Sequence, residues 1–276
     1  MKTSLNIGGK LLDLSDPVVM GILNVTPDSF HSGSRVLNNN DLLKMATKML
    51  NDGAAIIDIG GHSTRPGSEK VDLEMEINRV APAINSVMKE FPDAVLSIDT
   101  FHSDVARVAI DNGASIINDI SGGTIDNEMF QTVSELKVPY IMGHIQGNFY
   151  TMMDETNYSN LMTDLINHFA NSIQLLKTLG VHDIVVDPCF GFSKTIDQNF
   201  TILKNLAYFT NLEMPILVGL SRKSMIYKFL EISPEEALNG TTVLNTIALV
   251  NGASILRVHD VKEAVDAIML FQKTCN

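Results

Sequence analysis

Residues 161–187 read LMTDLINHFANSIQLLKTLGVHDIVVD, and this stretch contains one complete helix-to-strand unit. Its first part predicts an amphipathic helix, because apolar residues recur at intervals of three and four. They are Leu161, Leu165, Phe169, Ile173 and Leu176. Gly180 then stands in the usual place after a helix, and Asp183 to Asp187 is a short apolar run of the kind that forms a strand buried on both faces. The stretch therefore predicts a helix that leads into a strand of a parallel sheet.

The same alternation of apolar runs and amphipathic segments continues along almost the whole chain. Eight candidate strands lie at Val18 to Asn24, Ala55 to Gly60, Ala94 to Asp99, Ser115 to Asn118, Val138 to Met142, Asp183 to Asp187, Pro215 to Gly219 and Ser254 to Val258. Eight βα units predict an α/β fold, the (β/α)8 TIM barrel, and the 276 residues suit one domain spanning 1–276. Ser4 to Leu14 predicts an N-terminal β-hairpin that plugs the barrel floor.

The charge and composition exclude several classes of partner. The formal net charge of −12 disfavours nucleic acid and anionic membranes, which both attract positive surfaces. The longest apolar runs, such as Val18 to Leu23, are too short to span a bilayer, and the N-terminus does not resemble a signal peptide. We therefore expect a cytoplasmic protein. Cys189 and Cys275 are the only cysteines, and their spacing suggests neither a metal site nor a disulfide framework.

Cations gather after the predicted strands, at the rim where barrel enzymes place their chemistry. They are Arg65, Lys194, Arg222, Lys223, Arg257 and His259. A basic pocket in an acidic protein suggests an anionic ligand, and Asn24 could complete the side of the rim that holds it. Phosphate or pyrophosphate is the expected group, because barrels often bind phosphate after their seventh and eighth strands. Taken singly, Arg222 and Lys223 could also be solvated first-turn residues, and His259 a surface histidine.

Short hydrogen-bond acceptors end three other strands. Asp99, Asn118 and Asp187 suit a heterocycle rich in N–H groups, such as a pterin, whose amino group and ring N–H a carboxylate can accept together. A single Asp at a strand end is more often a turn residue or a helix cap. Three acceptors facing one barrel mouth favour the ligand interpretation.

Seven ordered blocks resemble the dihydropteroate synthase family, from about Val18 to the last helix. They are GILNVTPDSF (21–30), GGHSTRPG (60–67), SIDT (97–100), INDISG (117–122), DPCFGF (187–192), SRKS (221–224) and RVHD (257–260). The resemblance implies a transferase of folate biosynthesis that joins 6-hydroxymethyl-7,8-dihydropterin pyrophosphate to 4-aminobenzoate. Pyrophosphate would leave first, and the arylamine would attack the cationic pterin methylene. It also implies Mg²⁺ and a homodimer formed through the last helices.

The resemblance further implies a role for each matching residue. The pterin would be held by Asp99, Asn118, Met142, Asp187, Gly191, Phe192 and Lys223. The pyrophosphate would be held by Asn24, Thr64, Arg257 and His259, with Asn24 also a ligand of Mg²⁺. The 4-aminobenzoate site would comprise Phe30, Thr64, Arg65, Pro66, Lys223 and Ser224. Asn24, Lys223, Arg257 and His259 would be the catalytic residues, and Asp28 would organise the first loop.

Five positions depart from the common family pattern. Ser32 stands where an Asp usually precedes the glycine of the first loop, so a carboxylate that could support the cationic intermediate is missing. His62, Gly143, Cys189 and Ser193 also differ, the last two standing where Gly is common. A pterin-binding methyltransferase domain is one alternative, although it has no pyrophosphate to hold. A non-catalytic pterin-binding paralogue is the other, and Ser32 motivates it.

Overall fold

Eight parallel strands close into a barrel in the computed structural model, which describes residues 2–26, 39–62 and 72–275. The sheet order is β8-β7-β6-β5-β4-β3-β10-β9. A parallel bridge between Val186 and Ile216, with Val186 N donating to the Pro215 carbonyl at 2.9 Å, joins the two ends. The predicted barrel is therefore confirmed. The strands are β3 Val18–Asn24, β4 Ile56–Gly60, β5 Leu96–Asp99, β6 Ile116–Asp119, β7 Tyr140–Met142, β8 Ile184–Val186, β9 Leu217–Val218 and β10 Ile255–Val258.

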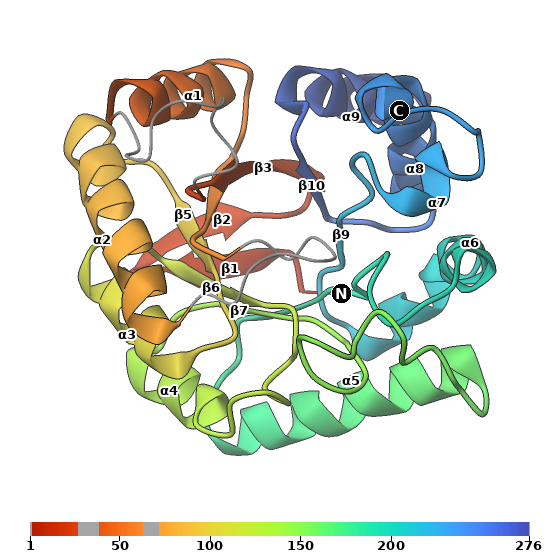
Figure 1. Cartoon of the computed structure of the whole chain (residues 1–276), viewed down its shortest axis with the longest axis horizontal. Coiled ribbons are helices and arrows are strands. Elements are labelled where there is room, and N and C mark those ends of the chain that lie inside the picture. The colour runs from red at the N-terminus through yellow and green to blue at the C-terminus, as the bar shows by residue number, and fades with distance from the viewer. Residues whose placement is uncertain (1, 27–38, 63–71, 276) are drawn as a thin grey trace.

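Helices form the outer ring around the strands (Figure 1). They are α1 Asn39–Asn51, α2 Leu73–Glu90, α3 Ser103–Asp111, α4 Met129–Leu136, α5 Leu161–Thr178, α6 Ile196–Lys204, α7 Ser224–Tyr227, α8 Leu238–Val250 and α9 Val261–Cys275, with 3-10 turns η2 Leu206–Leu212 and η3 Glu235–Ala237. The apolar stripe predicted for α5 faces inward, because Leu165, Phe169, Ile173 and Leu176 are buried. Among the described residues, no helix is long and apolar enough to cross a membrane.

The predicted N-terminal hairpin covers the floor of the barrel. Its strands β1 Ser4–Ile7 and β2 Lys10–Asp13 pair antiparallel around Gly8 and Gly9, whose positive φ angles suit a tight turn. Leu5, Ile7 and Leu14 are buried against a ring of inward-facing residues, several of them the first of their strand. The ring comprises Met20, Ile56, Ile116, Ile141, Val185, Leu217 and Ile255. The hairpin thereby completes the apolar lower half of the core.

Strand periodicity determines where the polar side chains lie. Because alternate residues of a strand point to the same face, the position two residues beyond the apolar ring points into the barrel again. These second positions include Asp58 on β4, Asn118 on β6, Asp187 directly after β8, and Arg257 on β10. The upper layer of the barrel is therefore polar, while the lower layer is hydrophobic.

Candidate functional site

Arg257 lies at the centre of the polar layer and joins two carboxylates. Its Nε donates to Asp58 Oδ2 at 2.6 Å, and its Nη2 donates to Asp99 Oδ2 at 2.5 Å. Burial alone would lower the pKa of Arg257, but Asp58 and Asp99 more than offset it and hold the pKa above its usual value. The guanidinium is therefore a fixed positive charge in the mouth of the barrel.

Asp58 is a site residue that the sequence interpretation did not single out. Its side chain is fully buried, and Oδ2 also accepts a hydrogen bond from Asn118 Nδ2 at 3.0 Å. This bond sets the orientation of the Asn118 amide and leaves its carbonyl oxygen as an acceptor. The signal was available, because a carboxylate inside the apolar run Ile56–Gly60 is costly to bury unless it is paired.

Asn24 and Asp99 face each other across Gly60. The sheet register pairs Asn24 with Gly60 and Gly60 with Asp99, so the three residues form one row across β3, β4 and β5. A Cβ on Gly60 would lie 3.5 Å from Asn24 Oδ1 and 3.7 Å from Asp99 Oδ2. Glycine therefore leaves space for both polar side chains on the same level of the rim. Burial raises the pKa of Asp99, and the neighbouring Arg257 opposes that rise.

Asp187 and Lys223 form the opposite side of the mouth. Asp187 is buried, which raises the pKa of its carboxyl group, and its Oδ1 accepts from Cys189 N at 2.7 Å. Lys223 Nζ lies 4.0 Å from the centroid of the Phe192 ring, a cation–π distance. Burial, with Arg257 as the second cause, lowers the pKa of Lys223 to about 8. Gly191 is needed here, because its φ is +84° and a Cβ would lie 3.1 Å from Lys223 Cδ.

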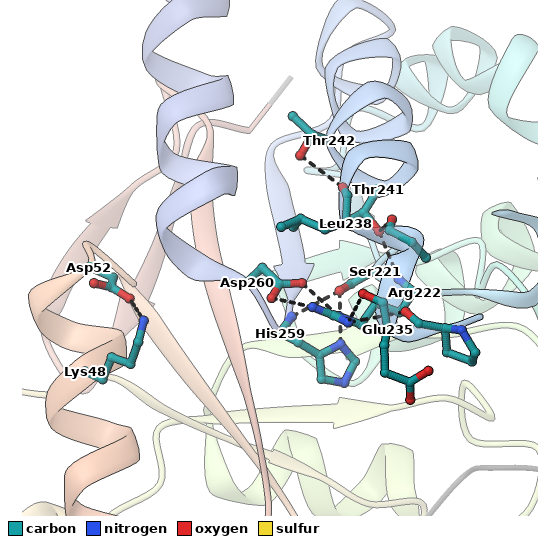
Figure 2. Close-up of polar contacts among 12 residues, drawn as sticks. Lys48, Asp52, Ser221, Arg222, Glu235, Leu238, Thr241, Thr242, His259 and Asp260 are labelled. Carbon is teal, nitrogen blue, oxygen red and sulfur yellow. Dashed lines mark hydrogen bonds and ion pairs between the residues drawn. The ribbon is translucent and has the colours of Figure 1, made fainter. Parts of the chain in front are cut away.

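Ser221 fixes the proton position of His259 (Figure 2). Ser221 Oγ accepts from the backbone N of His259 at 3.2 Å and lies 3.0 Å from its Nδ1. Because the hydroxyl oxygen already accepts the backbone N–H, we assign its proton to Nδ1, which leaves Nε2–H as a donor. Desolvation by the surrounding protein, with the charge of Arg257, lowers the pKa of His259 to about 4, although the residue as a whole is exposed. His259 is therefore a neutral hydrogen-bond donor at pH 7.

Arg222 anchors the segment that carries Lys223, as Figure 2 shows. Its Nε and Nη2 donate to the two carboxylate oxygens of Asp260 at 3.0 and 2.9 Å, and Nη1 donates to the Glu235 carbonyl at 3.0 Å. The backbone of Arg222 is left-handed, with φ of +54°. These bonds make Arg222 a support of the loop rather than a free cation for substrate. Ser224 follows as the first residue of α7.

The remaining predicted positions are not all in this group. Met142 is fully buried and packs in the outer core between strands and helices, so it does not join the polar cluster. Phe30, Thr64, Arg65 and Pro66, as well as Asp28 and Ser32, lie outside the described residues. In the part of the chain that the structure describes, no cluster of three or more His, Cys, Asp or Glu is arranged to hold a metal.

Two of the departures from the family pattern have a structural meaning. Cys189 and Ser193 both have φ of +53°, a conformation that glycine adopts without strain. The Ser193 hydroxyl gains a partner in exchange, because Gln146 N donates to it at 2.8 Å. Cys189 is buried, and burial raises the pKa of its thiol, so it is a wall residue and not a reactive nucleophile. His62 packs against Phe149, with ring centroids 4.3 Å apart.

Known proteins resemble the chain over nearly its whole length. A family model described as "Pterin binding enzyme" matches residues 20–259. A dihydropteroate synthase of Escherichia coli strain K12 is 40% identical over 268 residues, which cover 96% of this chain and 94% of that protein. Identity at this level over nearly complete chains places both proteins in one family.

Solved structures agree with the sequence comparison. A Yersinia pestis dihydropteroate synthase, solved with a sulfonamide drug complex, has a TM-score of 0.92 and 38% identity, and the match covers 99% of both chains. A Xanthomonas albilineans dihydropteroate synthase with 4-aminobenzoic acid has a TM-score of 0.92 and 33% identity, covering 100% of this chain and 99% of that one. The chain therefore belongs to the dihydropteroate synthase family of pterin-binding enzymes.

Proposed function

We propose that this chain condenses 6-hydroxymethyl-7,8-dihydropterin pyrophosphate with 4-aminobenzoate, giving 7,8-dihydropteroate and pyrophosphate. One observation carries the proposal: acceptors for a pterin and donors for a pyrophosphate meet in one barrel mouth, joined through Arg257. The structure of the Xanthomonas albilineans relative with 4-aminobenzoic acid supports the choice of the second substrate. The chain is in this account a transferase of folate biosynthesis.

The pterin ring binds between the carboxylates of Asp99 and Asp187, which lie on opposite sides of the barrel mouth. Asp99 and Asp187 accept its amino and ring N–H groups, while the free carbonyl oxygen of Asn118 and the ammonium of Lys223 complete its polar edge. An analogue without those N–H groups leaves buried acceptors unpaired, which costs affinity strongly. Gly191 and Phe192 form the wall of the pterin site beside Lys223. The contact between the Phe192 ring and Lys223 Nζ supports this placement.

The pyrophosphate binds where cations and neutral donors meet. Arg257 supplies the fixed charge and His259 supplies Nε2–H, so charge that builds on the leaving group is stabilised by groups already in place. Pyrophosphate departs first and leaves a cationic pterin methylene, which the amino group of 4-aminobenzoate attacks. The reaction needs no protein nucleophile, consistent with the raised thiol pKa of Cys189.

Asn24 is the residue that fits a role in binding Mg²⁺. Its amide oxygen is a hard ligand at the rim, facing Asp99 across Gly60. Mg²⁺ commonly takes one or two protein oxygens together with substrate phosphates and water, so a full protein cage is not required. A bound Mg²⁺ would supply positive charge that stabilises the leaving pyrophosphate. Arg257 and His259 hold the same group from the protein side.

The 4-aminobenzoate site combines residues of two kinds. Lys223 and Ser224 stand at the start of α7, beside the pterin wall. Phe30, Thr64, Arg65 and Pro66 are proposed from the family resemblance, and Thr64 is proposed to contact the pyrophosphate as well. Because Ser32 provides no carboxylate to support the cationic intermediate, the rate at which 4-aminobenzoate attacks the pterin methylene should be measured.

Product analysis of the purified protein tests this function. With Mg²⁺ and both substrates, we expect one dihydropteroate for each pyrophosphate released, measured by chromatography and a pyrophosphate assay. Tight binding of the pterin without product would instead identify the non-catalytic paralogue. Transfer of a methyl group to or from a reduced pterin, with no use of the pyrophosphate ester, would identify the methyltransferase alternative.

We also propose that the protein is a homodimer, through α8 and α9, and that it is cytoplasmic. Four large apolar side chains on these helices are well exposed: Val243, Val250, Met269 and Leu270 are 50%, 70%, 62% and 71% accessible. An apolar face of this kind marks an interaction surface, here for a second copy. Sedimentation should give a dimer, and Leu270→Asp should give a monomer. A monomeric wild-type protein would contradict the proposal.

A further inference from the structure

Lys194 is a buried cation that the reaction does not use. Only 7% of it is accessible, and its ammonium donates to three backbone carbonyls: Phe192 at 2.9 Å, His144 at 3.1 Å and Cys189 at 3.4 Å. Among the described residues, no carboxylate lies within ion-pair distance of it. Burying a charged group costs free energy unless the group is fully hydrogen-bonded. The buried ammonium of Lys194 is therefore a candidate for a specific role.

The three carbonyls belong to the two loops that follow β7 and β8. In the second loop, Cys189, Gly191 and Ser193 all have positive φ, and this path turns the carbonyls of residues 189 and 192 toward one point. The ammonium satisfies both of them together with the His144 carbonyl of the first loop. Without the Lys194 ammonium, these converging carbonyl groups would lose their shared donor, and the loop of residues 189–193 would change its conformation.

Relaxation would reach the substrate site through Phe192. The carbonyl of Phe192 is held by Lys194, while its ring lies against Lys223 Nζ at 4.0 Å. We propose that Lys194 is a positioning residue for the pterin substrate: it fixes the Gly191-Phe192 wall, and with it Lys223, by holding the carbonyls of two loops. The inference rests on the proposed function, because it names the substrate that the wall contacts.

The fold has other ties between the same loops, so loss of Lys194 need not unfold the chain. Tyr158 Oη donates to the Ser193 carbonyl at 2.8 Å, and Gln146 N donates to Ser193 Oγ at 2.8 Å. Burial lowers the pKa of Lys194 to about 8, so the ammonium predominates at neutral pH. A neutral replacement of similar length therefore removes the charge and its hydrogen bonds together, with little change in volume.

The decisive experiment compares Lys194→Met with Lys204→Met, an exposed lysine of α6. Loss of a hydrogen bond to a charged group changes an equilibrium constant by about 10- to 100-fold, so we expect Lys194→Met, which displaces Lys223, to raise the Kd for the pterin pyrophosphate by about that factor. The KM for 4-aminobenzoate should rise by a smaller factor, because Lys223 also lines that site, and amides 189–193 should exchange faster with deuterium. Lys204→Met should match the wild type in all three measurements.

Two results would overturn the inference. A folded Lys194→Met protein that binds the pterin as tightly as the wild type contradicts it, and so do equal losses for both substrates. If Lys194→Met does not fold, Lys194→Arg keeps the charge without the compact ammonium. A larger loss for the pterin than for 4-aminobenzoate is again expected, whereas wild-type binding of the pterin contradicts the inference. A wild-type protein that binds no pterin would refute the proposed function itself.

Discussion

Arg257 on β10 and Asp99 on β5 lie on strands separated by β3 and β4, yet Arg257 Nη2 and Asp99 Oδ2 are 2.5 Å apart. The pair spans the barrel mouth and joins the proposed pterin site to the proposed pyrophosphate site. Because Asp99 Oδ2 and Arg257 Nη2 share a hydrogen bond, a change at either residue alters the charge and position that the other presents to substrate. A substitution in the proposed pterin site should therefore have a measurable effect on binding in the proposed pyrophosphate site, and the reverse.

Asp58 should matter for turnover although it lies below the rim. In Asp58→Asn, Arg257 and Asn118 lose a charged acceptor worth about 1.5–3 kcal/mol, so kcat/KM for the pterin pyrophosphate should fall by about 10- to 100-fold. Steady-state kinetics measure the fall in kcat/KM, and urea unfolding measures the loss in the free energy of unfolding. Asp52→Asn is the control, because it breaks the Lys48–Asp52 pair drawn in Figure 2, a surface pair worth at most about 1 kcal/mol. Equal effects of the two substitutions would contradict the role of Asp58.

The alkaline side of the pH profile should report Lys223. Its pKa is lowered to about 8, so the ammonium loses its proton as pH rises through that value. We expect kcat/KM for the pterin pyrophosphate to fall above about pH 8 in the wild type, while Lys223→Arg should keep whatever activity it has to higher pH because a guanidinium stays charged. A wild-type profile that is flat up to pH 10 would show that the proton on Lys223 is not needed.

Ser221→Ala should affect the pyrophosphate end and spare the pterin end. Without the hydroxyl, Nδ1 of His259 loses its donor and the Nε2–H form is no longer enforced. We expect kcat to fall by about 3- to 10-fold, the value of one neutral hydrogen bond, with unchanged affinity for a pterin without pyrophosphate. Ser134→Ala, which removes a bond to the Leu179 carbonyl away from the site, should leave both properties unchanged.

Arg222 allows strain and anchoring to be separated. Arg222→Ala and Arg222→Gly both lose the bonds to Asp260, but only glycine relieves the left-handed backbone at φ of +54°. The glycine variant should be more stable than the alanine variant by about 1 kcal/mol, while both lose activity because Lys223 is no longer held. Chemical unfolding resolves the difference. If the alanine variant is as stable as the glycine variant, the backbone at this position carries no strain.

The sequence predicted the barrel well because strand periodicity and buried packing act locally. All eight predicted strands occur, and β3 has the predicted bounds of Val18 and Asn24. The predicted ends of β4, β5, β7 and β10 also match, and the remaining bounds differ by one or two residues. The hairpin over the floor was equally visible, since Gly8 and Gly9 mark its turn.

The site was predicted less completely, for a physical reason. Asp99, Asn118 and Asp187 were visible as polar residues ending apolar strands, but the partner of Arg257 at Asp58 depends on contacts between residues 199 positions apart. Lys194 looked like one more cation of the rim, although the structure buries it among carbonyls. Which of two neighbouring basic residues faces the substrate is decided by packing, as with Arg222 and Lys223.

Asp99→Ala provides the most direct test of the account, because it removes the pterin acceptor that Arg257 also holds. The measurement is dihydropteroate formation by the wild type and Asp99→Ala side by side, with circular dichroism to confirm that both are folded. We predict steady product formation by the wild type and none by the folded variant. Equal rates for the two proteins would contradict the assignment of this mouth as the active site.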